Sequence, residues 1–285
     1  MTETTPSTAA TTANQAGNQT VNQTANPTVA FAAPPAPARG SGPGPGTVAL
    51  RIAGGLVALT AVVAGARSVA GEFLHHTETT TTTYPATVRS VVAASEVGSI
   101  TVRAGAAGSA PQVRRTAEWS FGEPPATGRL DGQTLRLDGR CDDGGWFGGR
   151  CSIRYEITVA PETVLDLRSE TGTIRAEGMA GDLRASTSTG SVDLTGLRSP
   201  TVDAEGSTGT LRLAFAAPPR SVSAETSTGS VDVAVPGDGT AYAVKASTSV
   251  GSTTVTVPVD STSPRTITAR SSVGTVTVRP APAGP

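Results

Sequence analysis

Apolar and polar residues alternate in short paired runs along the C-terminal two thirds of the chain. In residues 183–194 every second position is apolar on each side of a polar Ser-Thr-Gly segment. Alternation with a period of two is typical of strands with one buried face. The apolar positions of three successive units are Leu183, Ala185, Val192 and Leu194; Val202, Ala204, Leu211 and Leu213; Val222, Ala224, Val231 and Val233. The pattern predicts two strands per unit around a narrow core.

The paired runs repeat, and each contains one glycine in a polar turn. The repeat glycines are Gly98, Gly172, Gly190, Gly209, Gly229, Gly251 and Gly274. The last six are 18 to 23 residues apart. A unit of this size cannot bury its own apolar face, so neighbouring units must stack. The sequence therefore predicts an all-β fold, a single-stranded β-helix or β-solenoid of 18–23-residue coils over residues 85–280.

The outward positions support this stacking, because equivalent residues of adjacent coils would lie about 4.8 Å apart. After the glycine, the outward row is Arg175, Asp193, Arg212, Asp232, Thr254 and Thr277. Before the glycine, it is Asp166, Arg184, Asp203, Ser223, Lys245 and Thr268. A third row, expected to satisfy turn hydrogen bonds, is Glu170, Ser188, Ser207, Ser227, Ser249 and Ser272. Adjacent charges alternate in sign in the first two rows, as expected for neighbouring coils in register.

The repeat is interrupted at about residues 104–164, where we expect an irregular β insertion. Its apolar runs are typical of antiparallel strands, either inserted after the first coil or continuing the stack irregularly. Cys141 and Cys151 flank a glycine-rich loop within this insertion. A disulfide between them is the expected state outside the cytoplasm. A metal pair is the alternative, although two cysteines without nearby histidines make an incomplete zinc site.

The N-terminal third has a different composition. Residues 1–46 are rich in Thr, Ala, Pro and Gly without apolar periodicity, which predicts a disordered tail. Residues 47–74 are apolar and predict a transmembrane helix; a cleaved signal peptide is the alternative. Residues 75–84 are expected to be a polar stalk, and residues 281–285 a short tail. Arginine placement favours a cytoplasmic N-terminus, with the C-terminal domain extracellular.

Composition and motifs argue against several functions. The formal charge is −1 and the 22 basic residues are scattered, which disfavours nucleic acid as a partner. The two histidines, His75 and His76, are adjacent to the apolar segment, so a serine or cysteine catalytic site in the repeats would have no histidine base. No phosphate-binding, dinucleotide or metalloprotease motif is present, and no cofactor is expected. Paired carboxylates that cleave sugars remain an alternative, but alternating charge rows explain the acidic residues without catalysis.

The STGSVDL-like unit, the apolar segment before it and the passage from Cys151 to Leu194 resemble the bacterial putative adhesin family, which is frequent in actinobacterial membrane proteins. The resemblance covers about residues 85–280 and implies a surface-exposed, non-catalytic β-helix without functional residues to transfer. We therefore expect a single-pass, membrane-anchored, extracytoplasmic β-solenoid in adhesion or cell-envelope interaction. Its expected partners are a cell-wall polymer, a surface or an envelope protein. The alternative is an envelope-stress or regulatory sensor whose outer solenoid binds a ligand or protein and whose N-terminal tail signals inside.

Overall fold

The computed structural model describes residues 75–120, 123–141 and 150–281, which form one 14-stranded sheet. The strands are β1 (His76–Thr83), β2 (Ser90–Ala104), β3 (Gln112–Trp119), β4 (Ala126–Asp131), β5 (Thr134–Gly139), β6 (Cys151–Val159), β7 (Val164–Glu177), β8 (Leu183–Leu197), β9 (Thr201–Thr208), β10 (Leu211–Phe215), β11 (Ser221–Thr228), β12 (Val231–Val235), β13 (Ala243–Val255) and β14 (Thr266–Pro280). The all-β prediction is confirmed for these residues. None of them belongs to a helix suited to crossing a bilayer. The predicted tail (1–46), membrane helix (47–74) and all but the first residue of the C-terminal tail (281–285) lie outside them.

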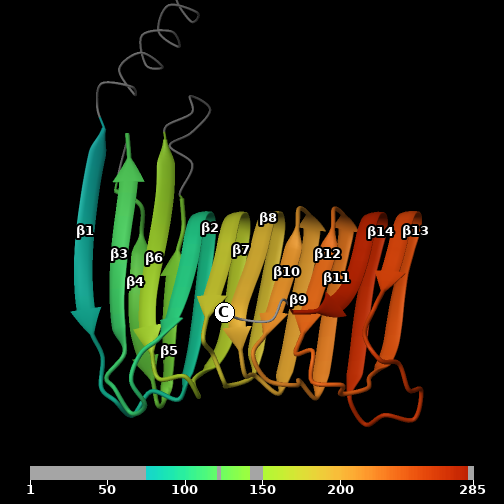
Figure 1. The fold of residues 1–285 in the computed structure, drawn as a ribbon. Coiled ribbons are helices and arrows are strands. Elements are labelled where there is room, and N and C mark those ends of the chain that lie inside the picture. Colours follow the sequence, from blue (N-terminus) through green and yellow to red (C-terminus); the bar gives the residue numbers. More distant parts are fainter. Residues whose placement is uncertain (1–74, 121–122, 142–149, 282–285) are drawn as a thin grey trace, which may run out of the picture. The chain divides into compact units, whose positions relative to one another are not determined.

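Each coil of the solenoid contributes a strand segment to each of two walls (Figure 1). Strands β2, β7, β8, β13 and β14 run through the glycine turn and pair in both walls. Two other coils are divided at the turn, one into β9 and β10 and one into β11 and β12. Neighbouring coils are parallel and in register, so Gly98 lies beside Gly172 and Gly172 beside Gly190.

The core is a thin apolar layer between the two walls. All the inward positions predicted from residues 183–233 are buried, from Leu183 at 3% exposure to Val233 at 0%. Burying a Val, Leu or Ile side chain contributes roughly 1.5–3 kcal/mol relative to exposure. Small residues such as Ala185, Ala204 and Ala224 keep the walls close together. Each coil therefore depends on its neighbours for a closed core.

The order of coils in the stack departs from chain order at the C-terminal end. β14 pairs with β11 and β12 on one side and with β13 on the other. The chain thus leaves one position vacant after β12, builds β13 beyond it, and returns to fill the position with β14 (Figure 1). The serial order assumed for the outward rows is wrong here, because Thr277 rather than Thr254 follows Asp232.

Three arginines in and next to β14 account for its position. Arg265 donates to the carbonyls of Pro218 and Pro219 at 2.9 and 2.8 Å. Arg270 bonds Glu225 at 3.1 Å, and Arg279 holds both oxygens of Asp232 at 3.0 and 2.9 Å. A bidentate arginine–carboxylate pair fixes geometry more closely than a single contact. In β13, the residue in register with Arg270 is Ser247, which carries no charge.

The insertion does not separate the first coil from the stack. β2 pairs directly with β7 along both walls, although residues 105–163 lie between them in the chain. The inserted strands extend the stack on the opposite side of β2: β5 and β6 pair with it in parallel, as the two walls of one further coil. The expected antiparallel pairing is present farther out, where β3 pairs with β6 and β4 with β5.

Residues 76–83, predicted as part of a stalk, form the edge strand β1. All eight residues are exposed, and each pairs with β3 in an antiparallel ladder from His76–Trp119 to Thr83–Gln112. No residue of β1 is buried, so the segment lacks the apolar alternation by which strands are recognised. Its five consecutive threonines nevertheless favour extended backbone, because β-branched side chains suit strands. The ladder with β3 then supplies the backbone partners.

Candidate binding groove

The repeat glycines lie where the chain turns from one wall to the other. Their φ values run from 136° to 153°, a conformation that residues with a Cβ rarely adopt. The coils also touch there: a Cβ on Gly172 would overlap the carbonyl oxygen of Gly98, and one on Gly190 would overlap that of Gly172. Glycine is therefore required twice, by the backbone conformation and by the contact between coils.

Three of the hydroxyl groups that lie three residues before a repeat glycine bond the neighbouring coil, whereas those of Ser169, Thr187 and Thr226 are buried without a partner. Ser271 Oγ donates to the carbonyl of Gly229 at 2.9 Å, and Thr248 Oγ1 to that of Gly274 at 3.1 Å. Ser95 Oγ makes the equivalent bond to Ile153 at 3.2 Å. The sequence predicted such bonds for the next residue along, the row that lies two positions before each glycine. Of those residues, the serines at 188, 207, 227, 249 and 272 are exposed and face solvent.

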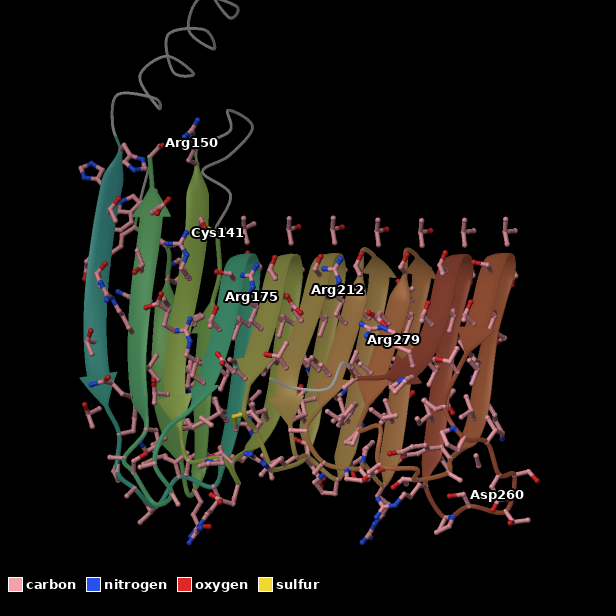
Figure 2. All side chains as sticks on the ribbon, in the orientation of Figure 1. Cys141, Arg150, Arg175, Arg212, Asp260 and Arg279 are labelled. Atoms are coloured by element: carbon pink, nitrogen blue, oxygen red, sulfur yellow. A yellow bond between two sulfur atoms is a disulfide. The ribbon has the colours of Figure 1, made fainter. Side chains whose placement is uncertain are left out.

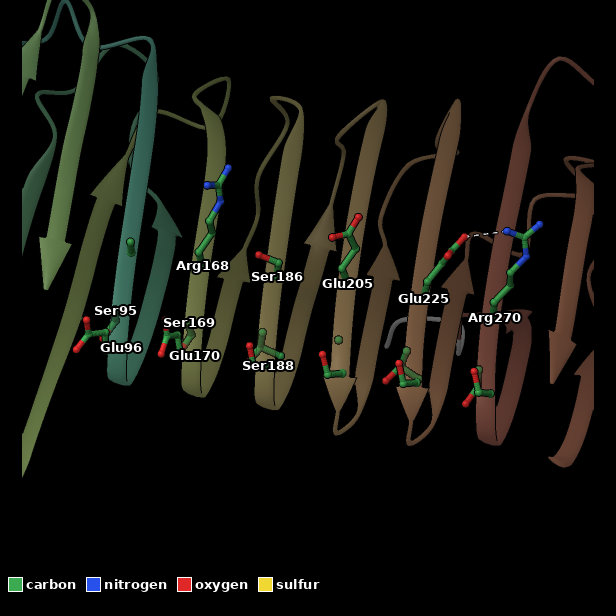
Figure 3. A pocket seen from close by; sticks show the side chains of 18 of the residues that line it. Ser95, Glu96, Arg168, Ser169, Glu170, Ser186, Ser188, Glu205, Glu225 and Arg270 are labelled. Atoms are coloured by element: carbon green, nitrogen blue, oxygen red, sulfur yellow. Dashed lines mark hydrogen bonds and ion pairs between the residues drawn. The ribbon is translucent and has the colours of Figure 1, made fainter. Parts of the chain in front are cut away.

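These exposed serines form part of a long hollow, the polar groove, which crosses the coils on the wall that precedes the glycines. Its volume is about 960 Å³. The residues that line it are Ala94, Ser95, Glu96, Asp138, Arg140, Arg168, Ser169, Glu170, Ser186, Thr187, Ser188, Glu205, Gly206, Ser207, Glu225, Thr226, Ser227, Ser247, Thr248, Ser249, Arg270, Ser271 and Ser272. Figure 3 shows their regular spacing from Arg168 to Arg270. The stacking of coils thus converts a short sequence motif into a continuous polar surface.

Ion pairs balance much of the charge in and beside the polar groove. Glu225 pairs with Arg270 at 3.1 Å, and Glu205 with Arg184 at 3.0 Å. At one end Arg140 approaches Asp138, also at 3.1 Å. These side chains are about half exposed, so each pair contributes little to stability. Their main effect is to leave hydroxyls, rather than one sign of charge, as the dominant feature of the groove.

One part of the wall places like charges together. Glu205 and Glu225 are direct neighbours in adjacent strands, and Asp203 lies beside them. Burial raises the pKa of Asp203 above its ordinary value of 3.8; the pairing with Arg184 at 3.3 Å opposes this, and Glu205 and Glu225 reinforce it. The alternating rows did not reveal this acidic cluster, because Glu205 and Glu225 lie in a different row.

The predicted row after the glycine lies on the second wall. Register places Asp193 between Arg175 and Arg212, and Arg212 beside Asp232, so the alternation of sign is present in the stack. Figure 2 shows Arg175, Arg212 and Arg279 along this wall. The bidentate contact of Asp232 is nevertheless with Arg279. Asp166 similarly bonds Arg168 on its own strand at 2.7 Å rather than its neighbour across the coils.

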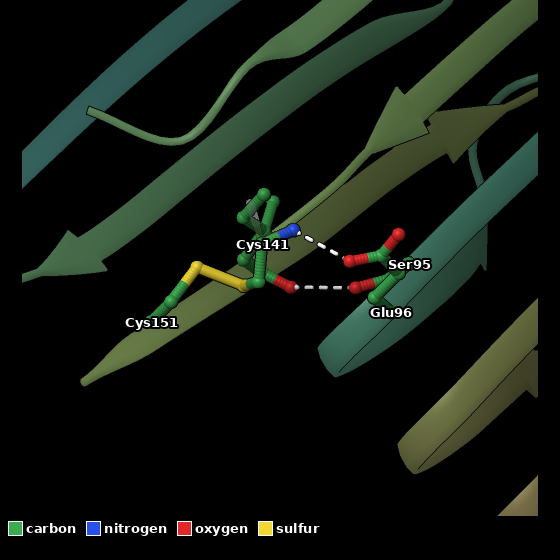
Figure 4. The surroundings of a disulfide bond; sticks show 5 residues. Ser95, Glu96, Cys141 and Cys151 are labelled. Carbon is green, nitrogen blue, oxygen red and sulfur yellow. Dashed lines mark hydrogen bonds between the residues drawn. A yellow bond between two sulfur atoms is a disulfide. The ribbon is translucent and has the colours of Figure 1, made fainter. Parts of the chain in front are cut away.

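A disulfide joins Cys141 to Cys151 where the coil formed by β5 and β6 passes from one wall to the other (Figure 4). The two Cα atoms are 5.7 Å apart. The backbone N–H of Cys141 donates to Glu96 Oε2 at 2.8 Å, which ties the disulfide to the adjacent coil at the end of the polar groove. Residues 142–149, between the two cysteines, lie outside the described part of the chain.

The chemistry available in the groove is hydrogen bonding. Among the described residues there is no cluster of three or more His, Cys, Asp and Glu side chains suited to a metal ion. His76 lies outside the groove on the edge strand β1, where its ring stacks on that of Trp119 with 5.8 Å between the ring centroids. Rows of hydroxyls, with five carboxylates and three arginines among them, suit an extended polar ligand without a large negative charge.

The described part of the chain is a β-solenoid, in which equivalent polar residues of successive coils line one groove. The model of the Toastrack DUF4097 family matches residues 129–279, more than half of the chain, so this protein belongs to that family. This confirms the family resemblance drawn from the repeat. No protein of curated function matches the chain.

Three solved structures are similar to this chain. A "putative cell adhesion protein" of Clostridium sporogenes has 9% identity and a TM-score of 0.38, covering 72% of this chain and 100% of the other. A "putative adhesin" of Bacteroides fragilis has 16% identity and a TM-score of 0.33, with coverages of 72% and 97%. A "putative lipid binding protein" of Parabacteroides distasonis has 9% identity and a TM-score of 0.29, with coverages of 73% and 97%.

Proposed function

We propose that this protein is a non-catalytic, membrane-anchored β-solenoid that binds a cell-envelope component outside the cell, in adhesion or envelope interaction. The polar groove carries the proposal. It is continuous over the stack, and its side chains offer donors and acceptors at regular intervals. A hydroxyl-rich polymer such as a cell-wall glycan presents matching groups along its length. The apolar segment 47–74 supplies the proposed anchor, and the disulfide fits an oxidising compartment.

The binding test is co-sedimentation of the full chain, held in lipid nanodiscs, with insoluble bacterial peptidoglycan. Ser188→Trp and Ser227→Trp place large side chains on the exposed edge of the groove, where they should block a bound polymer. Thr195→Trp is the matched control, because this exposed residue of β8 lies outside the groove. We expect loss of sedimentation for the first two variants alone. Failure of the unmodified protein to sediment would refute this ligand.

The location test uses intact cells, a protease that cannot cross the membrane, and tags at both ends of the chain. Loss of the C-terminal tag with retention of a membrane-bound N-terminal tag is the expected result. Protection of the C-terminal tag would reverse the proposed topology and point to an intracellular scaffold.

The sensor alternative makes a different prediction for residues 1–46. A sensor needs a cytoplasmic partner for this tail, whereas an anchor does not. Cross-linking in cells through a photoreactive residue in the tail distinguishes the two. A partner whose capture depends on residues 1–46 would favour the sensor.

A further inference from the structure

A second cavity, distinct from the polar groove, lies at the end of the stack where the inserted strands are. There the wall of β1, β3 and β6 and the wall of β4 and β5 enclose a space of about 370 Å³. This is within the size range of small-ligand sites. Its lining residues come from β1, β3, β4, β5 and β6 and from Tyr84, which follows β1.

Tyr155 of β6 brings a buried donor to this cavity. The residue is 2% exposed, it lines the cavity, and its hydroxyl has no hydrogen-bond partner. Burial raises the pKa of Tyr155 to about 12, so the phenol keeps its proton at neutral pH. A buried hydroxyl without a partner costs on the order of 1–3 kcal/mol, which a ligand acceptor would recover.

Arg115 of β3 supplies a second donor beside the first. It is the direct cross-strand neighbour of Tyr155, and its Nε is buried without a partner. The rest of its guanidinium is only lightly engaged: one Nη donates to the carbonyl of Ala126 at 3.3 Å, and the other lies 3.7 Å from Glu78. The positive charge is therefore held at the cavity with hydrogen-bonding capacity remaining.

Two buried apolar side chains also line the cavity. Val113 of β3 and Leu137 of β5 are each 4% exposed, and they come from the two different walls. The cavity thus combines one cation and two unpaired donors with an apolar patch, and Thr80, Thr82 and Thr127 add hydroxyls to the rest of the lining. A carboxylate carried on a short hydrocarbon chain has the complementary arrangement: two acceptor oxygens, a negative charge and an apolar body.

We propose that this end cavity binds a medium-chain carboxylate, with Arg115 and Tyr155 holding the carboxylate and Val113 and Leu137 contacting the chain. The site does not depend on the polar groove, and it can be tested whether or not the groove binds a polymer.

Isothermal titration of octanoate into the full chain in lipid nanodiscs, with empty nanodiscs as the blank, measures this binding. We expect saturable binding of one octanoate per chain, and at least tenfold weaker binding of octanol, which keeps the hydrocarbon but lacks the charge. Absence of saturable heat above the blank, or equal affinity for octanol, would overturn the proposal.

Three variants test whether Arg115 and Tyr155 bind the carboxylate. Tyr155→Phe and Arg115→Gln should each weaken octanoate binding about 10- to 100-fold, the range for a hydrogen bond to a charged group. Arg114→Gln is the matched control, because Arg114 directly precedes Arg115 in β3 and its side chain is 59% exposed. It should bind like the unmodified protein. Equal weakening in all three variants would contradict a contact at Arg115 and Tyr155.

Tyr155→Phe also separates binding from folding. It removes one unpaired hydroxyl and keeps the ring, so its thermal midpoint should equal or exceed that of the unmodified protein. Unchanged octanoate affinity in a folded Tyr155→Phe protein would show that the hydroxyl has no role in the cavity.

Discussion

At the scale of single residues, the repeat glycines determine how closely two coils can approach. The contact between Gly190 and the carbonyl of Gly172 leaves no room for a methyl group, and the backbone is in a conformation that disfavours one. The first requirement comes from the stack, whereas the second comes from the backbone of the turn. A glycine in an open turn faces only the second of them.

We expect Gly190→Ala to lower the free energy of unfolding by more than Gly108→Ala does. Gly108 also has a positive φ, 70°, but no atom lies within 4 Å of a Cβ placed there. The left-handed conformation at Gly108 costs a residue with a Cβ roughly 1–2 kcal/mol. The φ of 146° at Gly190 lies outside that region, and only Gly190→Ala adds overlap with a neighbouring carbonyl. Urea unfolding measures both. Equal losses would mean that the coils separate without cost at the turn.

Asp203 predicts a particular pH dependence. Its folded-state pKa is raised above 3.8, so between 3.8 and the folded value the folded protein binds more protons than the unfolded chain. The titration of Asp203 therefore makes the free energy of unfolding of the unmodified protein fall as the pH rises from 3.8 to the folded-state pKa. Asp203→Asn removes this titration, so the stability of the variant relative to the unmodified protein should increase with pH above 3.8. Urea midpoints measured between pH 3 and pH 7 test this.

Asp260 is the natural contrast to Asp203. Hydrogen bonds from the side chain and backbone of Thr262 hold the pKa of Asp260 below 3.8. Its contribution is present above pH 3.8 and is lost as pH falls through the folded value. The stability of the Asp260→Asn variant relative to the unmodified protein should therefore decrease as the pH rises toward 3.8. The same trend in both variants would contradict the assigned causes.

At the scale of elements, the disulfide closes the turn of the coil formed by β5 and β6. The two cysteines are 10 residues apart in the chain, and closing a loop of that size stabilises a protein by about 3 kcal/mol in the chain-entropy model. Cys141→Ser should lower the free energy of unfolding by up to that amount. Urea unfolding with and without a reductant checks it. The reductant should affect the unmodified protein and leave the variant unchanged.

Element prediction from the sequence succeeded where side chains alternate between core and solvent. The apolar alternation at Leu183 and Val192 predicts the parts of β8 on either side of Gly190, and both residues are buried. It failed at β1, because an exposed edge strand has no buried face to produce a pattern. The end cavity was also not predicted: Arg115 and Tyr155 lie 40 residues apart, and only the pairing of β3 with β6 brings them together.

At the scale of the whole described region, coil order was the main feature that the repeat could not supply. Period and register are the same whichever coil follows β12. The charged residues of the repeats distinguish the two orders. In serial order Glu225 and Asp232 would lie beside Ser247 and Thr254, which carry no charge. In the observed order β14 brings Arg270 to Glu225 and Arg279 to Asp232. Comparing the charges of non-consecutive repeats would have favoured the observed order.

Two truncations test this order. In a chain ending at residue 265, β14 is missing, and β13 loses the one strand it pairs with. We expect residues 243–255 to be cut readily by protease in that chain, and its stability to be no greater than that of a chain ending at residue 242. In serial order β13 would remain docked on β12, so a protected segment 243–255 would refute the arrangement.

The position of β14 also bears on how the chain is completed during synthesis. Each coil up to β12 can join the stack as it leaves the ribosome or the translocon, since its neighbour already exists. β13 cannot join the stack at that stage, because the strand with which it pairs, β14, is the last to be synthesised. The last part of the solenoid must therefore remain open until residues 266–280 are released. Stalled or prematurely terminated chains would expose an unpaired strand and an uncovered core, which quality-control proteases can recognise.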